Sequence, residues 1–180
     1  MTTAPTIELR TFTTPEAPRG DLLDVYAEVR APLLHLPNYA VTAFGERFDR
    51  HGTEPGFVAV LAYADEHPVG YAYGNRIEHG DRYWQRTSPA PADEYTEYPA
   101  LAIKEIGVRP NWRKTGTARR IHDALLLASP GERYVTLMVN GAAGDGKVRA
   151  LYRSWGYEDI GHSQPSPASP RLTVMIRPVR

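Results

Sequence analysis

The chain is 180 residues long, carries a formal net charge of zero and has a sequence pI near 7.0. This length suits a single domain over residues 1–180. The neutral charge excludes a global basic field of the kind that draws a protein to nucleic acid or anionic lipid, so any anion site must be local.

Residue usage also argues against metal, disulfide and membrane chemistry. The sequence has no cysteine, which excludes disulfides and thiolate sites, and its six histidines show no i, i+4 pair. Residues 1–10 lack the pattern of a secretory signal, and the longest apolar run, residues 57–64, is too short to span a bilayer. We therefore expect a cytoplasmic protein with no bound metal and no nucleic-acid or membrane partner.

The first half of the chain predicts a strand, two helices and a hairpin. Residues 7–12 alternate apolar and polar side chains and end at a turn, as a strand does. Helical spacing after Asp21, a candidate N-cap, predicts the first helix. A second helix is expected over residues 40–49, followed by paired strands over residues 57–63 and 69–73.

The second half begins with a loop over residues 79–99, which contains Gly, Asp, Ser and a cluster of prolines and alanines at residues 88–92. This loop is longer than most connections in compact domains. The remaining strands are expected over residues 101–108, 134–139, 157–161 and 172–176, with helices over residues 118–128 and from Asp145 to Gly156. This order predicts a mixed α/β fold, with a central sheet of about seven strands flanked by about four helices.

The segment from Val108 to Ala118 places a glycine turn between a strand and an amphipathic helix. Helix N-termini expose unpaired N–H groups and a partial positive charge, so they accept phosphates. Gly116 allows close backbone approach, and Arg113 and Lys114 add local positive charge. The alternative is an ordinary turn, because so loose a pattern arises by chance in roughly one sequence in five.

A second motif follows on the last predicted helix. With both motifs in place, the chain resembles the GNAT superfamily of N-acetyltransferases, whose signature Arg/Gln-x-x-Gly-x-Gly/Ala is matched by Arg113, Gly116 and Ala118. The family's last helix often ends in Leu-Tyr, three residues, Gly and an aromatic residue, as Leu151 to Tyr157 does. The order of strands and helices resembles that of the family over residues 7–179. Similarity at the level of sequence motifs covers residues 105–157 only.

The resemblance implies that acetyl-CoA is the acyl donor. It implies that the backbone of Ile106 and Val108 pairs with the pantetheine arm. It further implies pyrophosphate binding by the amides of Lys114, Thr115, Gly116, Thr117 and Ala118. The family's last helix frequently opens with Asn. Asp145 stands at that place here, and Asn140, at the end of the preceding strand, is the candidate for the cofactor contact.

Gly107 interrupts an otherwise apolar strand. Glycine at such a position commonly marks a bulge, which would splay the two central strands and admit the cofactor arm. The alternative is a glycine that merely fits under a neighbouring side chain. With the motif beside it, we favour the bulge and count Gly107 among the cofactor-binding residues.

Acetyl transfer to an amine needs a general acid, a general base and an oxyanion donor. Tyr152 matches the family's acid position, and a phenol is protonated at neutral pH and can donate to the leaving sulfur. The alternative is an aromatic core residue beside Trp155. Glu105, just before the cofactor strand, is the candidate base, working through water. The alternative there is an exposed strand glutamate opposite Lys104 or a neighbouring cation.

Other residues could take the role of base. Glu97, Tyr98 and His35 are the reserves.

The loop over residues 79–99 interleaves aromatic and acidic side chains, which suits a cationic, partly apolar amine. We expect it to cover the acceptor pocket, with Trp84 and Tyr98 as substrate-binding residues. The alternative is a solvated insertion or a dimer contact, which leaves a homodimer open. A small-molecule, antibiotic-like or peptide amine would fit as acceptor, since fold does not fix the substrate.

A different function is a catalytically silent acyl-CoA-binding or regulatory domain. It would keep the phosphate loop without the chemistry. Tyr152 and Glu105 argue against it. A P-loop or dinucleotide protein is set aside because neither glycine fingerprint is present.

Overall fold

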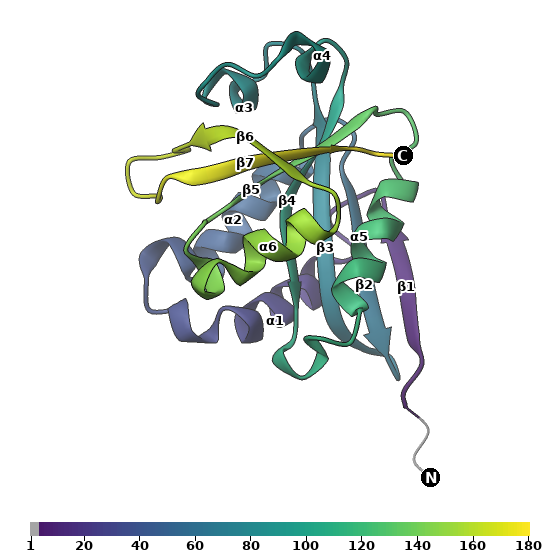
Figure 1. Cartoon of the computed structure of the whole chain (residues 1–180). Coiled ribbons are helices and arrows are strands. Elements are labelled where there is room, and N and C mark those ends of the chain that lie inside the picture. Colours follow the sequence, from purple (N-terminus) through teal and green to yellow (C-terminus); the bar gives the residue numbers. More distant parts are fainter. Residues whose placement is uncertain (1–3) are drawn as a thin grey trace. The chain divides into compact units, whose positions relative to one another are not determined.

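The computed structural model describes residues 4–180 and divides the chain into two compact units. Unit 1 comprises Met1–Asn75 and Lys104–Pro130, and unit 2 comprises Arg76–Ile103 and Gly131–Arg180. Among the described residues, seven strands form a mixed sheet in the order β1-β2-β3-β4-β5-β7-β6, which confirms the α/β class (Figure 1). The start of the predicted 1–180 domain and of the segment tested for a signal, residues 1–3, lies outside the described residues. The single domain stays a prediction.

Unit 1 follows the predicted order of a strand, two helices and a hairpin, and then holds the glycine turn and its helix. Its elements are β1 (Ile7–Phe12), α1 (Arg19–Val29), η1 (Ala31–Leu33), η2 (Pro37–Tyr39), α2 (Val41–Gly52), β2 (Val58–Ala64), most of β3 (His67–Ile77), the end of β4 (Ala100–Val108), η3 (Pro110–Trp112) and α5 (Thr117–Leu127). Asp21 was wrong as N-cap: Pro18 holds that position, and Asp21 accepts a hydrogen bond from Tyr63 instead.

The two faces of β2 and β3 pack against different helices in unit 1. Aromatic side chains at alternate positions, among them Tyr71 and Tyr73, form one buried cluster with α1 and α2. Gly70 points to the other face, where an added Cβ would lie 2.7 Å from Val108 Cγ1 and 2.8 Å from Ile121 Cδ1. Glycine at position 70 therefore lets α5 lie close to the sheet, alongside β1 and β2 (Figure 1).

Unit 2 contains the remaining strands and the helix of the second motif. Its elements are the end of β3, α3 (Arg82–Gln85), α4 (Asp93–Thr96), the start of β4, β5 (Tyr134–Val139), η4 (Ala143–Gly146), α6 (Lys147–Ser154), β6 (Glu158–Ser163) and β7 (Leu172–Pro178). β4 and β5 run parallel from Leu101↔Val135 to Ile103↔Leu137, whereas β7 pairs antiparallel with both β5 and β6. This parallel pair, next to the antiparallel pairs of β7, makes the sheet mixed.

The segment over residues 79–99 is more ordered than a long loop. It contains α3 and α4, and Ser88 exchanges two backbone hydrogen bonds of 2.9 Å with His162 of β6. Trp84 is 5% exposed and belongs to a buried cluster with Ile77, Ala100 and Ile176. The aromatic residues that made this segment look like a binding surface thus supply much of the core of unit 2.

The start of α6 differs from the prediction. Gly146, with φ 82°, is the N-cap of α6, and Asp145, with φ 56°, lies one residue before it. Asp145 was therefore wrong as the capping residue. Gly156, with φ 92°, follows the last turn of α6 as a C-terminal glycine should. Within residues 4–180, no helix has the length and apolar character needed to cross a membrane.

Candidate functional site

The loop from Arg113 to Ala118 enters α5 through two residues in left-handed backbone conformations. Lys114 has φ 62°, and Gly116, the N-cap of α5, has φ 81°. No side chain among the described residues caps the helix, and Arg113 and Lys114 are exposed. The first-turn N–H groups of α5 thus have no side-chain acceptor, which fits a site that takes phosphate oxygens.

The two threonines of this loop bind to each other and to its start. Thr115 Oγ1 donates to the carbonyl oxygen of Trp112 at 2.5 Å and lies 2.8 Å from Thr117 Oγ1. Thr117 is buried at the first position of α5. These contacts fix the backbone of the turn, so an anion would meet amides that are already in place.

Glu105 lies on the face of β4 that meets the end of α1. Its Oε1 accepts a hydrogen bond of 2.8 Å from Nη2 of Arg30, the C-cap residue of α1. The Glu105 side chain is 15% exposed and that of Arg30 is 34% exposed. The half-buried carboxylate is thus paired with a cation that comes from elsewhere in the chain, not with Lys104.

Three tyrosine side chains surround this ion pair. Burial raises the pKa of Tyr71, Tyr73 and Tyr26 above the ordinary value, and the negative charge of Glu105 adds to the shift in each case. The phenols are therefore neutral at physiological pH. The hydroxyl of Tyr71 is buried and has no hydrogen-bond partner among residues 4–180.

Gly107 lies on the same face as Glu105. An added Cβ at Gly107 would lie 3.3 Å from Val29 Cγ1 and 3.5 Å from the hydroxyl oxygen of Tyr71. This close approach is a reason for glycine at position 107 that needs no bulge. The bulge at Gly107, and the splaying that would follow from it, stays a prediction.

Lys104 begins the polar half of β4 and contacts Glu54, which follows α2. Its Nζ lies 3.9 Å from Glu54 Oε2, which also accepts a hydrogen bond of 2.5 Å from Asn75 Nδ2. His51, on α2, is 2.9 Å from the Tyr73 hydroxyl through Nδ1. Burial lowers the pKa of His51 to about 3, and the positive charge of Lys104 adds to the shift. His51 is therefore neutral at physiological pH.

Tyr152 is a buried aromatic residue of α6. It is 8% exposed, and its ring lies edge-on to those of Trp155 at 5.5 Å and Tyr157 at 5.9 Å between centroids. Such packing agrees with the alternative prediction, in which Tyr152 is an aromatic core residue. None of these contacts tests proton donation to sulfur, so the acid role stays a prediction.

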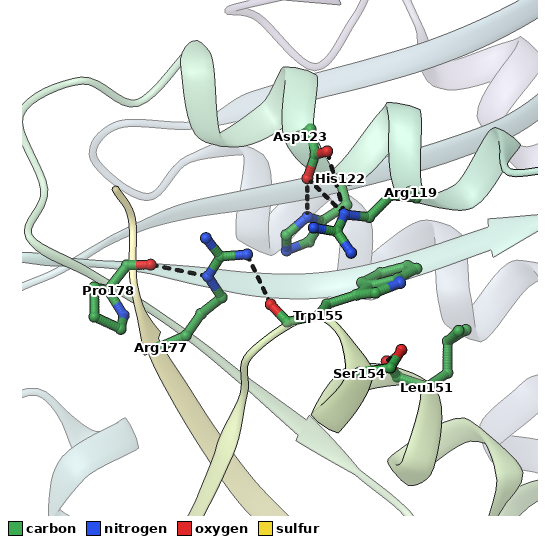
Figure 2. A network of polar contacts seen from close by, with 8 residues as sticks. All are labelled: Arg119, His122, Asp123, Leu151, Ser154, Trp155, Arg177 and Pro178. Carbon is green, nitrogen blue, oxygen red and sulfur yellow. Dashed lines mark hydrogen bonds and ion pairs between the residues drawn. The ribbon is translucent and has the colours of Figure 1, made fainter.

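The cations of α6 are engaged with the strand that follows. Arg149 and Arg153 both donate to the carboxylate of Asp159. Arg177 donates from Nη1 to the Trp155 carbonyl at 2.8 Å and from Nε to the Pro178 carbonyl at 2.9 Å (Figure 2). These bonds give the basic residues a role within unit 2.

The remaining predicted residues of unit 2 have their own local partners. Asn140 follows β5, and its Oδ1 accepts from the amide of Ala142 at 3.0 Å. Tyr98 is 42% exposed, with the Arg133 guanidinium 3.8 Å from its ring centroid. Trp84 is in the core. Substrate binding by Trp84 and Tyr98 stays a prediction.

The predicted residues divide between the two units. Glu105, Ile106, Gly107, Val108 and the loop 113–118 belong to unit 1. Tyr152, Asn140, Trp84 and Tyr98 belong to unit 2.

Two residues with notable contacts were missed from the sequence. Arg30 carries no local signal for its partner, since Glu105 is 75 positions away. His122 is fully buried on α5, with Nδ1 2.9 Å from Asp123 Oδ1, and Asp123 also pairs with Arg119 (Figure 2). Helical periodicity could have placed His122 beside Ile121 and Leu125 in the core. In the described part of the chain, no group of three or more His, Asp or Glu side chains is arranged to hold a metal ion.

A family model matches most of the sequence. The sequence model described as the Acetyltransferase (GNAT) family matches residues 22–157. No curated protein shows a significant match to the sequence.

Solved structures show the same fold at low sequence identity. Ard1 from Thermoplasma volcanium is 19% identical with a TM-score of 0.62, covering 97% of this chain and 98% of that one. An aminoglycoside 6'-acetyltransferase type Ii is 17% identical with a TM-score of 0.64, covering 96% and 97%. The PaiA N-acetyltransferase from Thermoplasma acidophilum, in complex with coenzyme A, is 13% identical with a TM-score of 0.61, covering 96% and 99%.

Proposed function

Because the chain belongs to the GNAT family of acetyltransferases, we propose that it transfers an acetyl group from acetyl-CoA to a primary amine by direct attack. The observation that carries the proposal is the entry to α5. Its N-cap is a left-handed glycine without a side-chain cap among the described residues, and it follows two exposed basic side chains. Such an entry presents free amides to a pyrophosphate.

The chain's own residues would hold the cofactor through the backbone. The amides from Lys114 to Ala118 would bind the pyrophosphate, and the backbone of Ile106 and Val108 would pair with the pantetheine arm. When bound, acetyl-CoA supplies the thioester whose acetyl carbon forms a bond to the amine nitrogen as the carbon–sulfur bond breaks. The protein then needs only to remove one proton from nitrogen and deliver one to sulfur.

Glu105 and Tyr152 would move these protons. Glu105 would take the proton of the amine, directly or through one water, because its carboxylate is half-buried and still reached by solvent. Tyr152 would give its hydroxyl proton to the departing sulfur. We expect Tyr152→Phe to lower turnover at least tenfold without changing CoA affinity, while Tyr157→Phe, a ring neighbour, changes neither. Equal turnover in Tyr152→Phe would remove the acid role.

The acceptor would be a small-molecule, antibiotic-like or peptide amine. An acidic hollow in unit 2, lined by His79, Asp93 and Glu97, suits a cationic group. One structural neighbour is an aminoglycoside acetyltransferase, which acts on such cations. Asp93→Asn with Glu97→Gln should raise the KM for a cationic acceptor, and an unchanged KM would separate this hollow from acceptor binding.

The test of the whole proposal is thiol release from acetyl-CoA against kanamycin, spermidine and a short peptide with a free N-terminus. Release with at least one amine is expected, and none with any amine under saturating acetyl-CoA would contradict it. Calorimetry with CoA then tests the binding loop. Gly116→Ala should weaken CoA binding, whereas Gly80→Ala should not, although both glycines have φ 81° and open space around Cα.

A further inference from the structure

Arg30 at the end of α1 faces the carboxylate of Glu105, and no sequence motif includes it. We propose that Arg30 is a positioning residue for acetyl transfer: it holds one oxygen of Glu105 and leaves the other to accept the acceptor's proton. This inference rests on the proposed function, because it assumes Glu105 as the base. Arg30 itself touches no reacting atom.

The backbone of Arg30 is fixed on both sides. Its amide donates to the Tyr26 carbonyl at 2.9 Å, and its carbonyl accepts from the Leu33 amide at 2.8 Å. Pro32 restricts the chain between them within η1. A cation at this place also complements the partial negative charge at the end of α1. The side chain of Arg30 therefore extends from a rigid backbone, at a helix end that favours a positive charge.

The side chain of Arg30 is committed to one carboxylate oxygen. Nη2 donates to Glu105 Oε1 at 2.8 Å, and no described residue hydrogen-bonds to Glu105 Oε2. Burial of Arg30 opposes its charge, but Glu105 more than offsets this and raises the pKa of the guanidinium above its ordinary value. Arg30 therefore stays a cation at every pH at which the enzyme could be assayed.

Other charged and titratable groups face the pair or its neighbours. They are Tyr26 on α1, Tyr39 on η2, Tyr71 and Tyr73 on β3, Arg47 on α2, and Lys104 on β4 with its partner Glu54 and neighbour His51. The tyrosines of α1 and β3 stay neutral because their pKa values are raised, and His51 stays neutral because its pKa is lowered. Within residues 4–180, Arg30 is the cation in ion-pair contact with Glu105.

The experiment compares Arg30→Met and Arg30→Lys with the wild type. The measurement is kcat/KM for acetyl transfer as a function of pH, with acetyl-CoA and the amine that gives the fastest thiol release. Removing a cation from beside a carboxylate favours protonation of the carboxylate. We expect Arg30→Met to move the low-pH limb of the profile upward by about one pH unit. Arg30→Lys should keep the limb near its wild-type position.

The matched control is Arg19→Met. Arg19 also lies on α1 and binds a carboxylate through its guanidinium, at 2.8 Å from Asp49 Oδ1, but that pair is exposed and outside the site. Its profile should coincide with the wild type. Thermal unfolding and CoA calorimetry on all variants show the folded fraction, since a purely structural Arg30 would lower the active fraction equally at every pH.

The outcomes separate the inference from the function it rests on. Thiol release by Arg30→Met with an unmoved low-pH limb would overturn the positioning role alone. If Arg30→Met fails to fold, the test uses Arg30→Lys alone. In that variant the low-pH limb of the kcat/KM profile should stay in place, and kcat should fall by a larger factor than KM changes. A limb that moves in Arg30→Lys would also overturn the inference. No release by the wild type would overturn the proposed function and the inference with it.

Discussion

The two halves of β4 differ in burial and in chemistry. Ala100–Ile103 is buried throughout and pairs in parallel register with β5, whereas the next four residues, 104–107, are only partly buried. The first half is uniformly apolar, and the second contains a lysine, a glutamate and a glycine. One continuous strand thus changes from core packing to polar chemistry between Ile103 and Lys104.

The difference shows how a carboxylate can be held in a fixed position on a strand while solvent still reaches it. Glu105 sits on a strand, so its backbone is fixed by hydrogen bonds, and its side chain is oriented by Arg30. The neighbouring half-buried positions leave solvent access that Leu101 or Ala102 would not have. Changes in the first half should therefore affect stability, and changes in the second should affect turnover.

Glu105→Gln makes the largest expected change and tests the polar half. The substitution keeps the shape of the side chain and removes its capacity to accept a proton, so kcat should fall by about 10²- to 10⁴-fold. Urea unfolding should also show a lower unfolding free energy, because Arg30 loses the carboxylate that offsets the burial of its charge, so turnover is compared per folded molecule. The matched control is Glu28→Gln, which loses the ion pair of Glu28 with Arg109 in the same unit and should retain turnover. Comparable losses in both variants would show that a lost charge, not a lost base, matters.

Leu101→Ala tests the buried half. Leu101 is 1% exposed, and truncating a buried leucine costs about 2–5 kcal/mol of unfolding free energy. Ile106→Ala, at a partly buried position of the other half, should cost clearly less, about 1 kcal/mol, because less apolar surface is removed from contact. Urea unfolding measures both values. Equal costs would show that the two halves do not differ in packing.

His51→Asn tests whether the buried, neutral His51 makes the stability of the chain depend on pH. The pKa of His51 is about 3 in the folded chain and ordinarily 6.5, so below pH 6.5 the unfolded chain binds a proton that the folded chain does not. Unfolding free energy should therefore decrease as the pH falls from about 6.5 toward 3, by at most about 1.4 kcal/mol per pH unit from this group. Urea unfolding of His51→Asn should show a shallower decrease. An identical pH dependence would assign the loss to other groups.

Local sequence patterns predicted most of the strands and helices. The alternation in residues 7–12 and the β-branched run in residues 134–139 gave strands with the same bounds as β1 and β5, because these signals depend on neighbouring residues alone. Helix starts were harder. Asp21 and Asp145 have the right side chains for N-caps, but the backbone conformation that decides a cap was not readable from composition.

The candidate site was predictable only in its local part. Gly116 at the start of α5 follows from the spacing of a strand, a glycine and a helix. The partner of Glu105 cannot be predicted in this way, because Arg30 is 75 positions away and no periodic pattern links the two residues. The role of the aromatic residues in the 79–99 segment is not readable from the sequence for the same reason: whether Trp84 fills a core or a pocket depends on tertiary packing.

Gly107→Ala should have the smallest effect, and it separates the two explanations of this glycine. If close packing is the reason, the added methyl group meets Val29 Cγ1 at 3.3 Å and should cost about 1 kcal/mol of unfolding free energy. Val29→Ala removes that contact, so in the double variant the cost of Gly107→Ala should largely disappear, as a double-mutant cycle by urea unfolding would show. An undiminished cost together with weaker CoA binding would instead favour the bulge, because the added side chain would then disturb the backbone that pairs with the cofactor arm.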